Sequence, residues 1–138
     1  MSDAEPAQLR TVPLFAEVDD DHLERIAAAA TPFEVENGYV LAERGQPGSG
    51  MFVILDGNVE VELANLDPVR LGPGEFVGEL SLLTDSNRLA RVRAIGPVRG
   101  LAIDRAAFRR LLHDEPRIAV AMLPVLARRL AALESDGA

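Results

Sequence analysis

The stretch FVGELSLLTDSNRLARVRA, residues Phe76–Ala94, joins a glycine-opened helical turn to a single arginine that leads into a strand. Gly78 has no Cβ, so the backbone at this position can approach a ligand closely. Residues 79–82 predict one helical turn, and the first N–H groups of such a turn attract anions. Arg88 follows the TDSN turn, and its guanidinium offers a fork of charged donors that suits phosphate oxygens. The stretch therefore predicts an anion site.

Glu79 adds a second chemical requirement to this site. A carboxylate accepts hydrogen bonds, so it should face a neutral group with donors, such as a sugar hydroxyl. One anion together with one diol indicates a nucleotide that carries a single phosphate. Taken singly, Gly78 fits a turn, Glu79 an exposed cap and Arg88 a surface ion pair, and only their combination argues for a site.

Two motifs of the chain resemble one family. Val77–Leu82 and Arg88–Val92 are similar to the phosphate-binding cassette of the cyclic-nucleotide-binding domain, found in catabolite-activator-type regulators, kinase regulatory subunits and cyclic-nucleotide-gated channels. The segment GQPGSGMFVILDGNVEV, residues 45–61, resembles the glycine loop, apolar run and Gly-x-Val hairpin of the same family. Leu89 departs from the pattern, because the family usually has Ser, Thr, Gln or Ala there.

The resemblance implies roles for individual residues. Glu79 accepts from the ribose 2′-hydroxyl, and Arg88 pairs with the cyclic phosphate. The backbone N–H groups of Leu80, Ser81 and Ala90 add further contacts. The ligand-binding residues implied in this way are Gly78, Glu79, Leu80, Ser81, Arg88, Leu89 and Ala90.

The identity of the ligand depends on Leu89. This side chain removes a possible hydroxyl contact, worth about 0.5–1.5 kcal/mol, and adds bulk beside the base. No Thr follows Arg88 to meet a guanine amino group, so the resemblance favours cAMP over cGMP. Two alternatives stay open. One is a degenerate fold that acts as a ligand-independent protein-interaction or dimerisation module, and the other is a site for another small anion.

Composition limits the class of protein. A chain of 138 residues fits one domain, residues 1–138, with one ordinary core. A net charge of −8 argues against nucleic-acid binding, and the absence of cysteine excludes disulfides and thiolate metal sites. No apolar run is long enough for a membrane span and no signal peptide is present, so we expect a cytoplasmic protein without membrane contact.

The order of patterns predicts a mainly β fold with flanking helices. An N-terminal helical segment covers residues 9–30, where Asp19 caps a helix; the acidic residues after it suit the helix start better than a metal site. From 31 to 103, short Val, Ile and Leu runs between turn residues indicate an antiparallel barrel or sandwich. The family implies a double-stranded β-helix, or jelly roll, with a short cassette helix. We expect turns at Asn37-Gly38, Asp56-Gly57-Asn58 and Gly96-Pro97, and we expect Arg91 and Arg93 to face water.

Two C-terminal helices are expected over residues 104–134. Asp104 starts the first, and Pro116 opens the second, in which Pro124 predicts a kink or break near Val120. Its apolar stripe comprises Ile118, Ala119, Met122, Val125, Leu126, Leu130 and Leu133. In bacterial relatives the equivalent helix makes the dimer and closes the nucleotide pocket, so the resemblance implies a homodimer. The chain has no room for a helix-turn-helix, so we expect no DNA-binding domain, and the output of a sensor would need an effector protein or a removed fused domain.

An enzyme is not expected. Barrels of this kind also occur as metal-dependent cupins, which need several histidines and a carboxylate on adjoining strands. The chain has two histidines, His22 and His113, and neither is predicted on the barrel. We therefore predict no catalytic residues and no metal. The expected function is a sensor whose C-terminal helices rearrange when the nucleotide binds.

Overall fold

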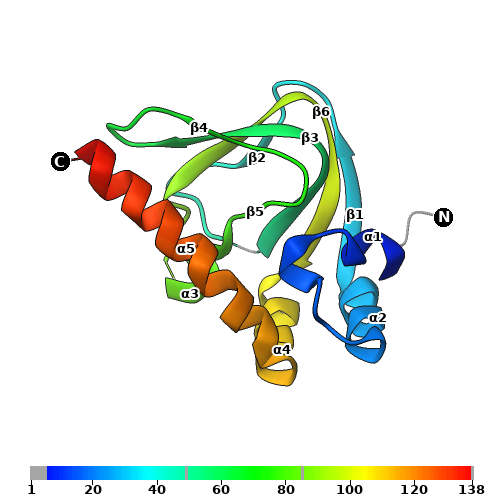
Figure 1. Ribbon diagram of the computed structural model, residues 1–138. Coiled ribbons are helices and arrows are strands. Elements are labelled where there is room, and N and C mark those ends of the chain that lie inside the picture. The colour runs from blue at the N-terminus through cyan, green and yellow to red at the C-terminus, as the bar shows by residue number, and fades with distance from the viewer. Residues whose placement is uncertain (1–5, 49, 85, 138) are drawn as a thin grey trace.

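A computed structural model describes residues 6–48, 50–84 and 86–137, without the side chains of Pro6, Leu80, Ser81 and 133–137. Helices open and close the described chain, and the strands lie between them (Figure 1). The elements are α1 (Pro6–Arg10), η1 (Pro13–Phe15), α2 (Asp20–Ala29), β1 (Ala30–Val35), β2 (Val40–Ala42), β3 (Gly50–Leu63), β4 (Val69–Leu71), β5 (Phe76–Val77), α3 (Glu79–Thr84), β6 (Ala90–Asp104), α4 (Arg105–Asp114) and α5 (Pro116–Gly137).

The strands form one antiparallel sheet that is built on the pairing of β3 with β6. The sheet order is β1-β6-β3-β4, with β2 added to β6 and β5 added to β3. The strands curve around a common interior, α1, α2 and α4 gather at one end, and α5 runs along one side (Figure 1). This arrangement is the predicted mainly β fold with flanking helices.

Two predicted turns are wrong, because each lies inside a continuous strand. Asp56-Gly57-Asn58 is part of β3 and Gly96-Pro97 is part of β6, and the register between the two strands shifts on either side of Asp56. Gly57 has a φ of +91°, and a Cβ there would collide with the carbonyl oxygen of Pro97. A glycine with positive φ serves a β-bulge as well as a turn, and the partner strand decides which one forms. The turn at Asn37-Gly38 is confirmed, with φ +86° at Gly38.

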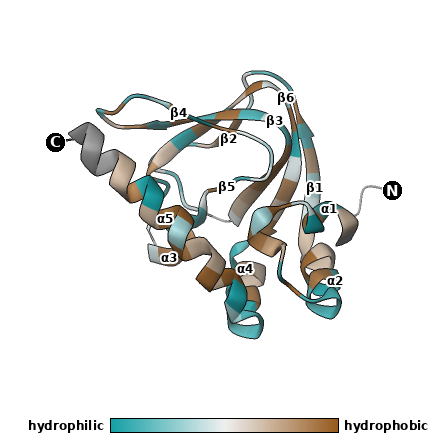
Figure 2. Ribbon diagram, in the orientation of Figure 1, coloured by the Kyte–Doolittle hydropathy of each residue, from teal (hydrophilic) through white to brown (hydrophobic). Residues whose placement is uncertain are grey.

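Two apolar clusters hold the fold together. One fills the inside of the barrel, and the other joins the end of the barrel to the helices. Figure 2 shows apolar segments along the strands and on α2, α4 and α5. The barrel cluster contains Ala42, Ile54, Val59, Leu71, Val77, Val92, Ala94 and Val98. Four of these residues, Ala42, Leu71, Val77 and Val92, also form part of the cavity wall at the predicted site.

Both predicted helix caps are confirmed. Asp19 accepts a hydrogen bond from the backbone N–H of His22 at 2.9 Å, and Asp104 accepts one from the backbone N–H of Ala107 at 2.8 Å. The Nδ1 atom of His22 lies 2.7 Å from Oδ1 of Asp19 and 3.3 Å from Oε2 of Glu115. Asp19 therefore caps α2 as predicted. Its carboxylate, the His22 ring and the Glu115 carboxylate also offer three ligand atoms within 4.8 Å of one another, so the capping contact does not decide between a cap and a metal site.

A kink or a break was predicted near Val120. The break is wrong, because α5 continues through Pro124, and the kink stays a prediction. A proline removes one backbone hydrogen bond, and its partner would be the carbonyl of Val120. Val120 is 65% exposed, so water can reach this part of the helix. Ile118 and Met122 are buried as predicted, but Leu130 is 57% exposed and does not belong to the packed stripe. Among the helices that the structure describes, none has the length and apolar character needed to cross a membrane.

Candidate functional site

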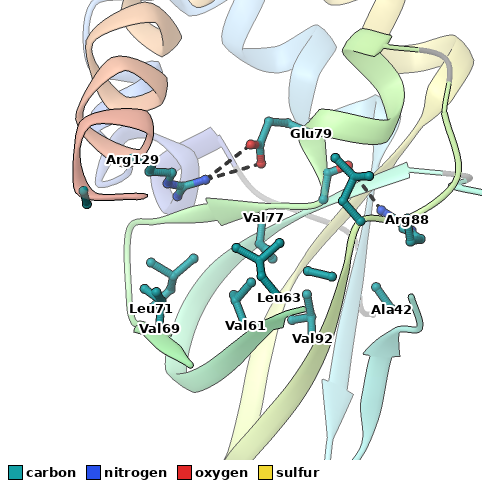
Figure 3. Close-up of a pocket in the computed structure, with 14 residues that line it drawn as sticks. Ala42, Val61, Leu63, Val69, Leu71, Val77, Glu79, Arg88, Val92 and Arg129 are labelled. Atoms are coloured by element: carbon teal, nitrogen blue, oxygen red, sulfur yellow. Dashed lines mark hydrogen bonds and ion pairs between the residues drawn. The ribbon is translucent and has the colours of Figure 1, made fainter. Parts of the chain in front are cut away.

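A cavity of about 200 Å³ opens where β3, β5 and β6 meet α3 and α5. Five of the seven predicted binding residues line it, namely Gly78, Glu79, Arg88, Leu89 and Ala90 (Figure 3). The backbone places Leu80 and Ser81 in the first turn of α3, and their side chains lie outside the described part. The remaining lining residues are Ala42, Val61, Leu63, Val69, Leu71, Val77, Val92, Arg129 and Ala132. The structure thus combines two arginines and one carboxylate with an otherwise apolar wall.

Gly78 is required by its backbone and by its surroundings. Its φ of +90° lies in a region that side chains disfavour. A Cβ would stand 2.7 Å from an Nη atom of Arg88 and 3.2 Å from the carbonyl oxygen of Gly50. The predicted reason for a glycine here was close approach to a ligand. The structure adds that this glycine lets the arginine side chain and two strands meet.

Arg88 is a buried cation at the wall of the cavity. It is 7% exposed, its Nη1 donates to the carbonyl oxygen of Gly78 at 3.2 Å, and its guanidinium lies 5.6 Å from the centre of the Phe52 ring. Among the described residues, no carboxylate lies within ion-pair distance of it. Burial, with a smaller effect of the nearby Arg105 charge, lowers the pKa of Arg88. A guanidinium nevertheless stays charged in proteins, so its charge remains available to an anion.

Glu79 is more deeply buried than Arg88, with 3% exposure. Its two carboxylate oxygens accept hydrogen bonds from Nη1 of Arg129 at 3.4 and 3.5 Å. Burial raises the pKa of Glu79, and the charge of Arg129 opposes this effect without cancelling it. A carboxylate in this setting can accept a hydrogen bond from a neutral hydroxyl that enters the cavity.

Arg129 is the residue that sequence reasoning missed. Its Nη2 donates to the carbonyl oxygen of Phe76 at 2.6 Å, and its guanidinium lies 4.6 Å from the centre of the Phe76 ring. It reaches the cavity from α5 and lies 50 residues from Glu79 in the chain. The sequence offers only an Arg128-Arg129 pair within an apolar helix, and nothing local links this pair to the cassette.

The residues after Arg88 divide between the cavity and the surface. Leu89 is 49% exposed and lines the cavity, while Ala90 begins β6 and pairs with Leu63. Arg91 binds Glu43 at 2.7 and 2.8 Å on the outer face of the sheet. The prediction that Arg91 faces water is confirmed, since its side chain is 43% exposed. Arg91 therefore offers a control for Arg88 only three positions away.

Comparison with known proteins agrees with this geometry. The family model of the cyclic nucleotide-binding domain matches residues 32–115. The chain belongs to this family. This family is defined by ligand binding rather than by a reaction, and the predicted family membership is confirmed.

Similar proteins place this family in several contexts. The chain is 37% identical to a putative potassium channel protein of Rhodopseudomonas palustris over 78% of this chain and 27% of that protein. It is 31% identical to a cAMP-binding acyltransferase from Mycobacterium smegmatis, with a TM-score of 0.76 over 92% of this chain and 41% of that one. It is 27% identical to the catabolite activator protein of Thermus thermophilus, with a TM-score of 0.77 over 90% of this chain and 62% of that one. These likenesses confirm the predicted jelly-roll fold. The chain spans 27% to 54% of the length of the first three curated relatives that it matches.

Proposed function

We propose that this cyclic nucleotide-binding domain, residues 1–138, is a cytoplasmic cAMP sensor, with cGMP as a weaker ligand. One observation carries the proposal. Arg88 is 93% buried at the wall of a cavity and has no carboxylate partner among the described residues. A buried charge without a counter-ion is unfavourable, and a phosphate in the cavity would supply one.

The cavity offers a distinct surface to each part of a cyclic nucleotide. The guanidinium of Arg88 and the backbone N–H groups of Leu80 and Ser81 would bind the phosphate. Glu79 would accept from the ribose 2′-hydroxyl. The apolar wall that includes Val61 and Leu71 suits a purine ring, because burial of apolar surface favours binding. The M. smegmatis relative, named as a cAMP-binding protein, supports cAMP as the first ligand to test.

The contact between Glu79 and Arg129 supports a route from ligand to α5. Arg129 donates hydrogen bonds to both the Glu79 carboxylate and the carbonyl oxygen of Phe76. A ribose hydroxyl on Glu79 would change this contact and shift the equilibrium position of α5. The response would pass to an effector protein or to a fused domain. Amide exchange over residues 104–134 with and without cAMP would test this step, and equal protection in both states would argue against it.

Calorimetric and thermal titration with cAMP, cGMP and AMP tests the proposal directly. Ligand at about 100 times its Kd should add about 2.7 kcal/mol to the free energy of unfolding. Arg88→Ala should remove this effect, while Arg91→Ala should keep it, because Arg91 lies outside the cavity. Absence of stabilisation by millimolar cAMP and cGMP in the unmodified protein would refute the proposal.

A second candidate is a ligand-independent module that forms a homodimer through α5. Three apolar side chains of α5 favour it, since Val120, Leu123 and Leu130 are 65%, 63% and 57% exposed. They follow one another at helical spacing, so a second copy of the helix would cover them. Exposed Leu89 beside the cavity also favours a contact surface. Neither observation excludes nucleotide binding.

Sedimentation velocity separates the two candidates. A dimer should dissociate in Leu123→Glu and persist in Leu83→Glu, because Leu83 is also exposed but lies on α3. A protein that dimerises and ignores nucleotides, even with Leu89→Ser, would be a contact module. A monomer in the unmodified protein at high concentration would exclude the dimer.

A further inference from the structure

The loop that precedes β3 holds the main chain of Arg88 on both sides. We call residues 45–48 the anchor loop. The N–H of Gly45 donates to the carbonyl oxygen of Arg88 at 2.9 Å, and the N–H of Arg88 donates to the carbonyl oxygen of Gln46 at 2.8 Å. Pro47 forms a bridge with Asn87 immediately beside them. The orientation of the Arg88 side chain therefore depends on the position of the anchor loop.

Arg105 reaches the anchor loop from the first residue of α4. Its Nη2 donates to the carbonyl oxygen of Gly48 at 2.7 Å, a short hydrogen bond from a charged donor. The preceding residue, Asp104, pairs with Gly50 across β6 and β3 and also caps α4. Two connections thus join the anchor loop to the start of α4. One is the Arg105 side chain, and the other is the pairing of Gly50 with Asp104 in the sheet.

Arg105 also carries a positive charge near Arg88. Burial is the main cause that lowers the pKa of Arg88, and the charge of Arg105 adds a smaller effect, so the two guanidinium groups interact electrostatically. Like charges disfavour each other, and an anion bound at Arg88 would offset the repulsion. The charge of Arg105, which does not line the cavity, would therefore strengthen the attraction for a phosphate without contacting it.

We propose that Arg105 is a positioning residue for the anion site, which fixes the anchor loop that holds Arg88 and adds a second positive charge near it. The proposal rests on the proposed nucleotide binding. It also gives α4 a connection to the phosphate end of the cavity, separate from the one that joins α5 to Glu79 through Arg129.

Three substitutions at Arg105 separate its two contributions. Arg105→Ala removes the hydrogen bond and the charge, Arg105→Lys keeps the charge, and Arg105→Gln keeps a neutral donor. Calorimetry should show cAMP affinity about tenfold weaker for Arg105→Ala, the loss expected for one charge-assisted hydrogen bond. Arg105→Lys should recover most of this affinity and Arg105→Gln less of it. Arg110→Ala, an exposed arginine on the same helix, should bind as the unmodified protein does.

The salt dependence of cAMP affinity shows whether Arg105 acts through its charge as well as through its hydrogen bond to the anchor loop. Screening weakens the attraction between Arg105 and the phosphate, so the affinity gap between the unmodified protein and Arg105→Gln should narrow as salt rises from 50 to 500 mM. Affinity of Arg105→Ala within twofold of the unmodified protein would overturn the proposal. Equal losses in the Ala and Lys variants would overturn the charge contribution.

Amide exchange in the absence of nucleotide tests the anchor loop independently. The N–H groups of Gly45 and Arg88 both donate across the loop, so they should exchange at least about threefold faster in Arg105→Ala and at an unchanged rate in Arg110→Ala. Unchanged exchange in both variants would refute the positioning role even if the protein bound no nucleotide. If the unmodified protein binds no cyclic nucleotide, the proposed function fails, and the exchange rates still decide whether Arg105 holds the loop.

Discussion

The two arginines of the cavity differ in where they come from and in what they contact. Arg88 leads into β6, is 7% exposed, and has no described carboxylate partner. Arg129 comes from α5, is 27% exposed in its side chain, and is paired with Glu79. Among the described residues, Arg129 therefore has a carboxylate counter-ion and Arg88 does not. This difference fits the proposal that one end of the cavity recognises an anion, while the contact of Arg129 at the other end joins α5 to Glu79.

The largest effect should come from removing the charge of Arg88. Arg88→Met should weaken cAMP binding by about 3 kcal/mol, or more than about 100-fold, because it removes a buried charge that would pair with phosphate. Without ligand, the same change should raise the free energy of unfolding by about 1 kcal/mol, since an apolar side chain replaces a buried cation that has no carboxylate partner among the described residues. Urea unfolding and calorimetry measure both effects.

Arg91→Met is the matched control, because Arg91 is exposed and paired with Glu43. It should leave affinity unchanged and alter stability little. If Arg88→Met and Arg91→Met changed cAMP affinity and stability by equal amounts, the proposed special role of Arg88 would be wrong.

Removal of Arg129 should affect stability more than affinity. Arg129→Met leaves the buried Glu79 without its cation, so we expect a loss of about 1–3 kcal/mol in the free energy of unfolding at neutral pH. The loss should be smaller when Glu79→Gln is already present, and a double-mutant cycle by urea unfolding measures this coupling. Additive losses would show that the contact carries no energy. A binding loss as large as that of Arg88→Met would show that both arginines recognise the ligand.

Gly78→Ala tests how closely the Arg88 end of the cavity is packed. Gly78 and Gly38 have similar φ angles of +90° and +86°, but a Cβ at Gly38 meets nothing within 4 Å. Both alanine variants should lose about 1–2 kcal/mol of stability from backbone strain. Only Gly78→Ala should also weaken cAMP binding, because its Cβ displaces the guanidinium of Arg88. Equal affinity in the two variants, measured by calorimetry, would contradict this explanation.

The smallest effect concerns the pH dependence of stability at the Glu79 end. Burial raises the pKa of Glu79 in the folded protein, so its ionisation opposes folding. Stability should therefore fall as pH rises from the usual carboxyl range through the raised pKa of Glu79, and remain level above it. Glu79→Gln should be more stable than the unmodified protein at neutral pH, with the difference vanishing in acid. Urea unfolding between pH 4 and 8 measures this difference. If Glu79→Gln were more stabilising in acid than at neutral pH, the pKa of Glu79 would be lowered in the folded protein rather than raised.

The sequence predicted those parts of the site whose residues are close together in the chain. Gly78, Glu79 and Arg88 were singled out by local backbone chemistry and motif spacing, and the structure brings the three to one cavity. Arg129 was not, because only the packing of α5 brings it to Glu79. Local signals also failed at Gly57, where a turn residue serves a bulge once β6 pairs beside it.

Helix ends were also predicted only where residues close together in the chain determine them. The caps at Asp19 and Asp104 were predicted correctly, because a side chain and a backbone group three residues apart form each one. Of the kink or break predicted near Val120, the break is wrong, because continuation of α5 depends on packing and solvent on its two faces.

The register of β3 with β6 has a consequence for how the chain folds. The ladder joins Leu63 to Ala90 at one end and Gly50 to Asp104 at the other, so it closes a loop that contains the cassette up to residue 89. Pairings between such distant residues form slowly, on the order of milliseconds to seconds. During synthesis, the ladder cannot be completed before residue 104 leaves the ribosome. The nascent cassette therefore emerges after β3 but before most of β6, the strand that completes the ladder. A ligand of the completed cavity could stabilise the fold only after that point.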